Sequence, residues 1–535
     1  MPQPRGRYTA ARPPGLADGW TQVRLTEPSR LYGANGIRTG PDGRIYVAQV
    51  SGSQISAIDV DTGAIEAISP MGGDIVGPDD LAFDSEGNLY ATEITEGRVS
   101  VRSPNGRTRV LQGDMPVANP ITFHEGRLIA GECRVGGRIM ELDLDGGAPR
   151  MILDNVPMPN AFAVGPDGKL YTPVMGTNEI WRVGLDGGAP EKVAGDLGVP
   201  DSVKFDSQGF IISTQVQSGQ VLRIDPRTGD RTVLADLSPG LDNSTFVGNR
   251  LFVSNINGSI VEILQGGKTK DLIPGGFNFP LGLAMGAEGI LFVADGPFCY
   301  TMRPGQARQR VGFLFDPGYP GYSRGAAAAG PGEFIVTTAN GDVARFWPEQ
   351  QRNEVIVRGF DQLYGVAISP RGAVVFAEQG AGRVHSVQSG NGQVLGTGLR
   401  QPSGVAVGAD DACYVSEAAG GRVVKLSAGK AHTVLDGLSK PLGIAVRGES
   451  LYVLDVGSKE LIEWDLVGRS RRTIAADLPI GAPPGVIPKR LGPIGNMSGP
   501  MGPFAGLAAG PDGTLYLSGD AEGSVLAIRR SASTP

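Results

Sequence analysis

The stretch PNAFAVGPDGKLYTPV, from Pro159 to Val174, has the pattern of two short strands joined by a Pro-Asp-Gly turn. Asp-Gly supplies the residues that tolerate left-handed backbone angles, as a tight hairpin requires. One residue departs from the apolar pattern, because Asn160 places a polar amide where the first strand begins. Related stretches elsewhere in the chain place a similar residue at the same point.

Related hairpins recur along the whole chain with a spacing of about 40 residues. Clear copies include GIRTGPDGRIYVAQ, DLAFDSEGNLYATE, GVAISPRGAVVFAE and GLAAGPDGTLYLSG, and weaker ones begin near Pro120, Asn243, Gly325 and Gly443. Each copy continues into a third strand such as GRVSVRSPNG and a fourth such as RTVLADL. Four short alternating strands at this period are typical of one blade of a β-propeller, so the sequence predicts an all-β protein of twelve four-stranded blades.

Twelve blades could close as one ring or as two rings of six, and the two ends of the chain favour two. The last repeat stops after its third strand, SVLAIRR, whereas Trp20 to Glu27 form an unmatched strand before the first repeat. If each half opens with such a strand and uses it to complete its own last blade, the domains are 1–266 and 267–535. TKDLIPG then opens the second propeller, after a linker from Gln265 to Lys268. The Gly/Pro-rich insertion 480–503 is expected to be a flap or packing loop on that second propeller.

Composition excludes several classes of protein. The net charge is -7 and there is no basic run, which argues against a nucleic-acid partner. No apolar stretch approaches 18 residues and the start has no apolar signal region, so we expect no membrane partner and a cytoplasmic location. The three cysteines are far apart and fit buried thiols in a reducing compartment better than disulfides.

A polar ring distinguishes the two halves. Counting back eight residues from each hairpin glycine, with one-residue gaps allowed, reaches the start of each innermost strand. In the first half this position holds Asn35, Asp79, Asn119, Asn160, Asp201 and Asp242. In the second half it holds Leu281, Gly325, Tyr364, Ser403, Leu442 and Ala505. Innermost strands surround the central channel of a propeller, so we expect the first set to form an inward-facing ring at one mouth.

Two explanations of this ring compete. Asn and Asp often cap turns before strands, but capping should then appear in both halves. Three carboxylates at one channel mouth would repel one another, and either a bound cation or protonation of one of them relieves this. Oxygen ligands of this kind suit a hard divalent cation. We therefore expect one cation, Ca²⁺ first, with Mg²⁺, Mn²⁺ or Zn²⁺ as alternatives.

A second position, six residues after each turn glycine, is polar in both halves and is therefore mostly structural. Within it, Glu93 and Glu132, together with the neighbouring Arg134, are candidates for contact with a substrate. Phe162 is expected to line the channel and is a further candidate for contact with a substrate. This mixed set of residues does not define the substrate beyond a small molecule.

The second half resembles NHL repeats in its GIAV-D-x-x-G-x-I/L-Y-V-A-D/E pattern. The first half resembles the gluconolactonase/senescence-marker-protein (regucalcin-like) family, which consists of six-bladed propellers with one catalytic divalent cation. The resemblance rests on PDSVKFDSQG around Asp201 and PNAFAV around Asn160. It implies metal ligands at Asn35, Asn119, Asn160 and Asp201. Asn35 departs from the family, which has Glu there, and Asp79 and Asp242 add two carboxylates.

The resemblance implies a metal-dependent hydrolase that opens a lactone or related ester, with Asp201 as ligand and general base. Asp79 and Asp242 are alternative bases or further ligands. His124, His385 and His432 are the only histidines and none falls at the ring, which argues against a histidine-based enzyme. The alternative is a non-catalytic double propeller that binds a ligand or protein and holds a structural cation. The apolar mouth of the second propeller suggests a scaffold or a homodimer surface.

Overall fold

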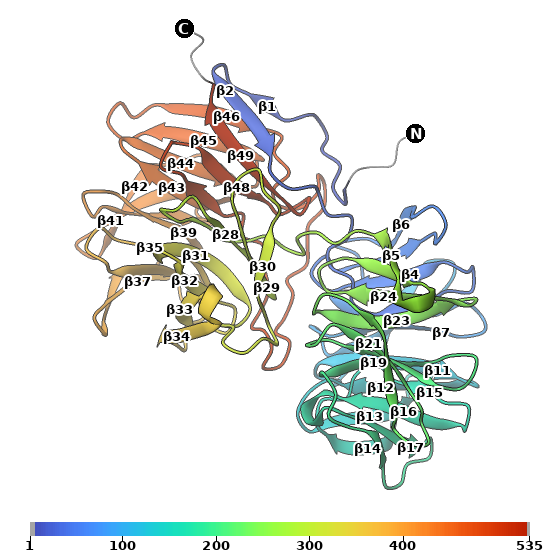
Figure 1. Ribbon diagram of the computed structural model, residues 1–535. Coiled ribbons are helices and arrows are strands. Elements are labelled where there is room, and N and C mark those ends of the chain that lie inside the picture. The colour runs from blue at the N-terminus through green and yellow to red at the C-terminus, as the bar shows by residue number, and fades with distance from the viewer. Residues whose placement is uncertain (1–5, 532–535) are drawn as a thin grey trace. The chain divides into compact units, whose positions relative to one another are not determined.

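The computed structural model describes residues 6–531, which fold into β-strands with three short 3-10 turns (Figure 1). The strands of these residues form twelve antiparallel sheets, eleven with four strands and one with five. The predicted all-β architecture of about twelve blades is therefore confirmed. Two compact units are present: unit 1 contains residues 30–278 and 486–495, and unit 2 contains, of the described residues, 6–29, 279–485 and 496–531.

The second sheet illustrates why the repeats form blades. Its strands are β7 (Pro78–Phe83), β8 (Leu89–Glu93), β9 (Arg98–Arg102) and β10 (Thr108–Gln112), in the spatial order β10-β9-β8-β7. The hairpin between β7 and β8 turns at Gly87, whose φ of 81° lies in the region that glycine adopts without strain. All five residues of β8 are buried, because both faces of this strand pack against neighbouring sheets.

Unit 1 contains six four-stranded sheets, the second of which is given above. The other strands are β3 (Ile37–Thr39), β4 (Ile45–Gln49), β5 (Gln54–Ile58) and β6 (Ile65–Ser69); β11 (Ala118–His124), β12 (Arg127–Glu132), β13 (Gly137–Leu142) and β14 (Arg150–Val156); β15 (Ala163–Val164), β16 (Lys169–Val174), β17 (Glu179–Gly184) and β18 (Glu191–Ala194); β19 (Pro200–Phe205), β20 (Ile211–Gln215), β21 (Gln220–Ile224) and β22 (Arg231–Asp236); β23 (Leu241–Val247), β24 (Arg250–Asn255), β25 (Ile260–Ile263) and β26 (Thr269–Ile273). The 3-10 turns η1 (Met175–Thr177) and η2 (Gln265–Gly267) also belong to this unit.

Unit 2 has the same plan. Its strands are β27 (Leu283–Met285), β28 (Leu291–Asp295), β29 (Phe298–Met302) and β30 (Gln309–Phe313); β31 (Ser323–Gly330), β32 (Glu333–Thr338), β33 (Val343–Trp347) and β34 (Arg352–Val357); β35 (Leu363–Ile368), β36 (Val374–Glu378), β37 (Arg383–Gln388) and β38 (Asn391–Gly396); β39 (Pro402–Val407), β40 (Cys413–Glu417), β41 (Arg422–Ser427) and β42 (Lys430–Leu435); β43 (Pro441–Arg447), β44 (Ser450–Asp455), β45 (Glu460–Asp465) and β46 (Arg471–Ala476), joined by β1 (Gly15–Leu16); and β47 (Leu507–Ala509), β48 (Leu515–Gly519) and β49 (Ser524–Arg530), joined by β2 (Trp20–Arg24). The turn η3 (Pro348–Gln350) lies between β33 and β34.

The innermost strands of each unit contact one another in a circular order. In unit 1 each innermost strand contacts the next along the chain, and β23 of the sixth sheet contacts β3 of the first. The Ser254 hydroxyl donates to the Asn35 carbonyl at 2.8 Å across this last contact. In unit 2, β47 likewise contacts β27, and the Ser518 hydroxyl donates to the Leu281 carbonyl at 2.5 Å. In both units, the first and last sheets are therefore neighbours.

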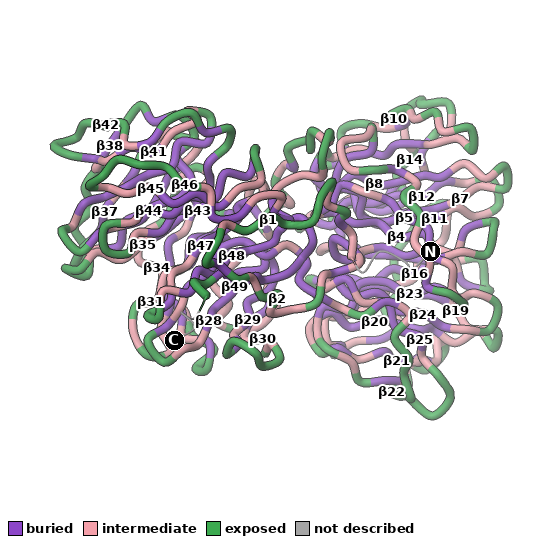
Figure 2. The backbone as a smooth tube through the Cα atoms, turned by 90° about the horizontal axis from the view of Figure 1, so that it is seen from above, coloured by how far each residue is buried: buried purple, intermediate pink, exposed green. Residues whose placement is uncertain are grey.

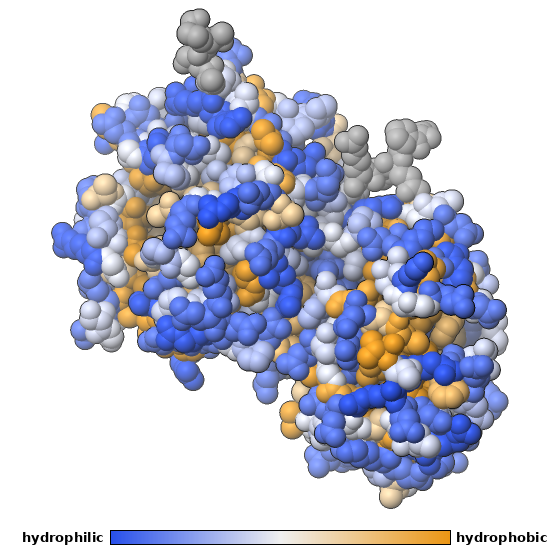
Figure 3. Space-filling view, in the orientation of Figure 1, coloured by the Kyte–Doolittle hydropathy of each residue, from blue (hydrophilic) through white to orange (hydrophobic). Residues whose placement is uncertain are grey.

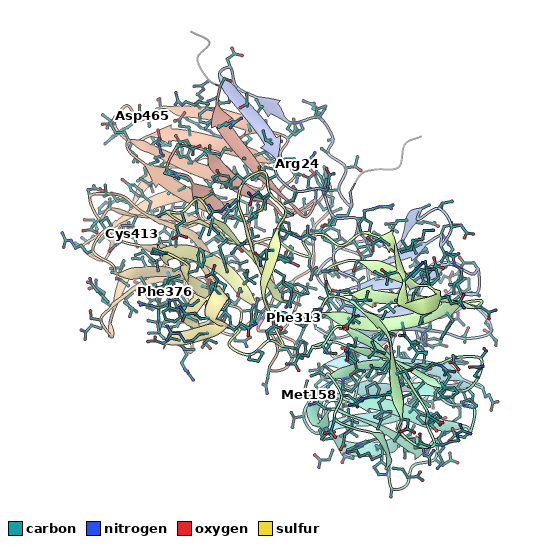
Figure 4. The ribbon with its side chains drawn as sticks, viewed as in Figure 1. Arg24, Met158, Phe313, Phe376, Cys413 and Asp465 are labelled. Atoms are coloured by element: carbon teal, nitrogen blue, oxygen red, sulfur yellow. The ribbon has the colours of Figure 1, made fainter. Side chains whose placement is uncertain are left out.

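The strands at the two chain ends correct the predicted domain boundary. β2 pairs with β49 from Trp20↔Arg530 to Arg24↔Leu526, so it completes the last sheet of unit 2 rather than a sheet of unit 1. Arg24, labelled in Figure 4, donates from Nε and Nη2 to both Glu522 carboxylate oxygens at 2.8 and 3.0 Å. β26 pairs with β25 in unit 1, and so TKDLIPG closes the first set instead of opening the second. The boundaries 1–266 and 267–535 are therefore wrong.

The insertion 480–503 also departs from the prediction. Val486–Gly495 cluster with unit 1, whereas the flanking residues belong to unit 2. Within unit 2, the Gly499 amide donates to the Asn340 side-chain oxygen at 2.7 Å. The expectation of a flap or packing loop on the second propeller is therefore wrong for residues 486–495.

The core lies between neighbouring sheets, where Figure 2 shows buried backbone in both units. Phe376 of β36 and Cys413 of β40 are examples in unit 2 (Figure 4). All three cysteines are buried free thiols, as predicted. Hydrophilic side chains cover most of the visible face of each unit (Figure 3). Among residues 6–531, no helix has the length and hydrophobicity needed to cross a membrane.

Candidate functional site

The six residues of the predicted ring occupy equivalent positions in the sheets of unit 1. Asp79 follows the pair Pro78↔Glu93, and Asp201 follows the pair Pro200↔Gln215. A shift in register comes directly after each of these pairs, so the ring residue lies in a bulge between two paired segments. The same arrangement holds for Asn119, Asn160 and Asp242.

Five of the six ring residues are buried polar groups. Exposure is 5% for Asp79 and Asp201 and 7% for Asp242, and Asn119 and Asn160 are buried as well. Asn35, which is partly exposed, donates from Nδ2 to Asp242 Oδ2 at 3.2 Å. This bond connects the ring members of the first and sixth sheets.

Burial and mutual repulsion raise the pKa values of the three aspartates. Burial, followed by repulsion from Asp80, raises the pKa of Asp79 to about 8. Burial and then Asp79 raise the pKa of Asp201 well above its usual range, and burial and then Asp201 do the same for Asp242. Because each carboxyl disfavours the charge of another, the ring favours protonation of part of its aspartates.

The side chains present restrict how a metal could be held. Within residues 6–531, no three His, Cys, Asp or Glu side chains form a group that could hold a metal ion. A cation at the ring would therefore need amide oxygens as well as carboxylates. Asn160 Oδ1 accepts the Ala161 amide at 2.8 Å and Asn35 Oδ1 accepts the Val50 amide at 3.3 Å, which leaves each carbonyl oxygen a second lone pair. The ring fits a hard cation in the chemistry of its donors.

The sequence did not predict a second polar cluster, formed by Arg38, Asp80, Lys204 and Asn243. Lys204 Nζ donates to Asn243 Oδ1 at 3.0 Å, and Asn243 Nδ2 donates to Asp80 Oδ1 at 3.2 Å. Arg38 Nη2 lies 3.7 Å from Asp80 Oδ2 and donates to the Ile121 carbonyl at 2.9 Å. Burial, followed by repulsion from Arg38, lowers the pKa of Lys204 to about 7. The spacing in the sequence could have indicated this cluster. Asp80 and Asn243 directly follow the ring residues Asp79 and Asp242, and Arg38 and Lys204 come three residues after the ring residues Asn35 and Asp201.

Two sulfur atoms lie beside the ring. Asn160 Nδ2 is 3.2 Å from Met175 Sδ, which is 3.9 Å from Cys133 Sγ. Burial, followed by repulsion from Asp201, raises the pKa of the Cys133 thiol well above its usual range. The thiol is therefore neutral at ordinary pH.

The proposed substrate residues have structural partners. Glu93 Oε2 accepts the Val76 amide and Arg98 Nη2, each at 2.7 Å. Glu132 is fully buried and accepts hydrogen bonds from Arg134 at 2.7 Å and from Arg138. These carboxylates are already engaged within their own sheets.

Phe162 lies in the hydrophobic cluster between the third and fourth sheets and is fully buried. The expectation that it lines the channel is wrong, because its neighbours there are core residues such as Ile129 and Leu170.

The corresponding ring in unit 2 contains one residue that the sequence count misplaced. Ser323↔Thr338 is the pair before the register shift in β31, and so the ring residue is Arg324 rather than Gly325. The ring of unit 2 then consists of Leu281, Arg324, Tyr364, Ser403, Leu442 and Ala505. It contains no Asp or Asn, so the contrast between the two units holds.

These observations define an all-β protein built from blade-like repeats, with a buried Asn/Asp ring in one of two units. A family model described as the SMP-30/gluconolactonase/LRE-like region matches residues 123–256. The matched part contains Asn160, Asp201 and Asp242, and it covers a minority of the chain. No curated protein shows significant similarity to this chain.

Several solved structures show slight similarity to about half of the chain. Virginiamycin B lyase from Staphylococcus aureus has 16% identity over 54% of this chain and 98% of the lyase chain, with a TM-score of 0.38. A gluconolactonase from Xanthomonas campestris has 16% identity over 48% of this chain and 96% of the other, with a TM-score of 0.39. A chain of a nidogen/laminin complex has 21% identity over 42% of this chain and 91% of the other, with a TM-score of 0.38. At TM-scores this low, these likenesses establish neither fold nor function.

Proposed function

We propose that unit 1 is a six-bladed β-propeller whose Asn/Asp ring hydrolyses a lactone or a related ester, and that unit 2 is a second six-bladed propeller. The circular contacts of the innermost strands and the bonds from Ser254 to Asn35 and from Ser518 to Leu281 support the closure of each unit. The family model that matches residues 123–256 supports the lactonase class.

The observation that carries the proposal is the group of three buried aspartates with raised pKa values. A general base works best when its pKa lies near the working pH, and the pKa of Asp79 is raised to about 8. Asp201, Asp79 and Asp242 are all candidates for this role. Asp201 comes first, because the family resemblance assigns the base to its position.

In the proposed reaction, one of these carboxylates takes a proton from a water molecule while the oxygen of that water adds to the ester carbonyl. The C–O bond between the carbonyl carbon and the leaving oxygen of the lactone then breaks, and the leaving oxygen takes up a proton. The product of a lactone is therefore a hydroxy acid. We assign Asn35, Asn119, Asn160 and Asp201 as the residues that would hold a divalent cation, with Ca²⁺ first. A bound divalent cation supplies Lewis acidity toward the carbonyl oxygen.

Lys204 and Arg38 add positive charge to the acidic ring from within the same unit. The charge of Lys204 lowers the pKa of Asp201 and so opposes part of the effect of burial. We propose that these two residues keep one aspartate ionised while the others are neutral.

A second function is favoured by one observation. Arg38, Asp80, Asn243 and Lys204 satisfy one another across different sheets of unit 1. Such a network would also suit a rigid binding scaffold with a structural cation and no catalysis.

Other predictions from the sequence stay predictions. They are the NHL-like character of unit 2, a homodimer formed through it, the cytoplasmic location, and the absence of nucleic-acid and membrane partners.

The test is hydrolysis of a panel of small lactones by the full-length protein, with the metal content of the same preparation measured. We expect activity that EDTA abolishes and Ca²⁺ restores, and a loss in kcat of about 100-fold or more in Asp201→Ala. Ser403→Ala, at a ring position of unit 2, is the matched control and should retain full activity. Turnover that survives both chelation and Asp201→Ala would contradict the proposal, whereas bound metal without turnover would favour the scaffold.

A further inference from the structure

The ring of unit 2 contains a fully buried cation. Arg324 lies on β31 at the position that Asp79 occupies on β7, and its exposure is 0%. A buried guanidinium is costly unless an anion or several acceptors compensate it. Unit 2 should therefore contain a compensating group near this side chain.

Contacts within the protein fix the plane of the Arg324 guanidinium. Nη1 donates to the Leu363 carbonyl at 3.1 Å. The guanidinium carbon lies 4.7 Å from the centre of the Tyr364 ring, in a cation–π contact. Tyr364 in turn packs edge-on against Phe504, with ring centres 5.8 Å apart.

The other edge of the guanidinium has no acceptor. Nε and Nη2 are both buried and form no hydrogen bond with any residue from 6 to 531. No carboxylate in that part of the chain forms an ion pair with Arg324. The compensating group is therefore not supplied by the described residues.

The equivalent edge of other arginines in this chain, formed by Nε and Nη2, binds carboxylates. Arg24 donates from Nε and Nη2 to the two oxygens of Glu522 at 2.8 and 3.0 Å. Arg250 does the same with Glu262 at 2.6 and 2.9 Å. Two parallel N–H groups match the two coplanar oxygens of a carboxylate, and so the edge of Arg324 has the geometry of a carboxylate receptor.

The surroundings limit the size of the ligand. A cavity of about 30 Å³ lies among the innermost strands of unit 2. Its lining includes Phe504, which packs against Tyr364, but not Arg324 itself. A glycine follows the ring residue in each of the six strands. A Cβ atom at Gly325, for example, would lie 2.3 Å from the Tyr364 carbonyl, so the inner strands are packed closely. Space of this size suits a group of a few heavy atoms.

We propose that Arg324 binds the carboxylate of a small organic acid, through Nε and Nη2, at the centre of unit 2. This site is separate from the Asn/Asp ring, and it does not depend on the hydrolase activity proposed for unit 1.

The test is thermal unfolding of the full-length protein with formate or acetate added at constant ionic strength. We expect the melting temperature of unit 2 to rise with carboxylate concentration in the wild type, because a ligand that binds the folded state stabilises it. Arg324→Met should abolish this rise. Arg345→Met is the control, because Arg345 is a half-exposed residue of the same sheet, paired with Glu333 at 3.3 Å, and its variant should keep the full rise.

Two results would overturn the proposal. One is an equal effect of carboxylate on the wild type and Arg324→Met. The other is a rise with phosphate, sulfate or chloride that matches or exceeds that with formate, because the site would then not be specific for carboxylates.

A second measurement does not require Arg324→Met to fold. The ¹³C signal of labelled formate should broaden in the presence of the wild-type protein and sharpen when unlabelled formate is added. Arg324→Lys keeps the charge but loses the two-nitrogen edge, and should weaken binding about 10-fold or more. Absence of broadening with the wild type would also contradict the proposal.

Discussion

Asp79 and Asp80 are adjacent in the sequence and have different surroundings. Asp80 accepts the Leu81 amide at 2.8 Å and the Asn243 side chain at 3.2 Å, and Arg38 lies 3.7 Å away. Asp79 is affected mainly by burial and by the charge of Asp80, which together raise its pKa to about 8. One of the two residues is thus held in a network, while the other is a candidate base.

The raised pKa of Asp79 gives a prediction about stability. Asp79 has an ordinary pKa of 3.8, so between about pH 4 and pH 8 the folded protein holds a proton that the unfolded chain has lost. The free energy of unfolding of metal-free protein should therefore fall as the pH rises through this range. Lys204 has the opposite effect, but only above about pH 7, where its pKa lies.

We expect chemical denaturation in EDTA to show this fall between pH 4.5 and 7, roughly the range over which the raised pKa values of the ring aspartates should act. Asp79→Asn should make the fall smaller, because one of the groups that causes it is removed. Asp225→Asn serves as control, because Asp225 is partly exposed and hydrogen bonds from Arg227 lower its pKa to about 2, outside this range. Stability that rises with pH in the wild type, or an unchanged fall in Asp79→Asn, would contradict this account of Asp79.

The ring was predictable at the residue scale because it recurs at a fixed distance from a hairpin glycine. The roles of Arg38 and Lys204 were not predictable. Each comes three residues after a ring residue, and nothing in a single repeat shows that its side chain contacts a residue of another sheet. Arg324 was misplaced by one residue because the count allowed one-residue gaps; counting back exactly eight residues from the turn glycine Gly332 gives Arg324.

At the scale of elements, the strands were predicted and the partners of two of them were not. The unmatched strand at Trp20 and the missing fourth strand of the last repeat were both visible in the sequence. β2 and β26 are each a short strand able to cover the outer edge of a sheet. The local sequence therefore does not show whether β2 completes the last sheet of unit 1 or that of unit 2. The ladder from Trp20↔Arg530 to Arg24↔Leu526 decides it.

This pairing predicts the effect of removing residues 1–25. Without β2, the outer edge of β49 is exposed and the last sheet of unit 2 loses a strand. We expect the unfolding temperature of unit 2 to fall by roughly 5 °C or more, while that of unit 1 is unchanged. Hydrogen exchange should show faster exchange in β48 and β49 and no change in β3 and β23. Loss of protection in unit 1 instead would support the closure that the sequence first suggested.

At the scale of the whole molecule, two units built from the same repeat differ in the charge of their central rings. Unit 1 buries Asp79, Asp201 and Asp242, whereas unit 2 buries Arg324 and no acid at the same positions. Both units share the same hairpins and the hydrogen bonds from a serine hydroxyl to a ring-position carbonyl. These features support the architecture without requiring a particular side chain at the ring positions. We therefore attribute the functional difference between the units to these few positions.

In the proposed function, the ring of unit 1 holds a divalent cation through amide and carboxylate oxygens. The most direct measurement is calorimetric titration of the metal-free, full-length protein with Ca²⁺, repeated with Asp201→Asn and Ser403→Ala. We expect one site per chain in the wild type and in Ser403→Ala, and binding weakened at least about 10-fold in Asp201→Asn. Failure of Ca²⁺, Mg²⁺, Mn²⁺ and Zn²⁺ to bind, or binding that Asp201→Asn leaves unchanged, would contradict it.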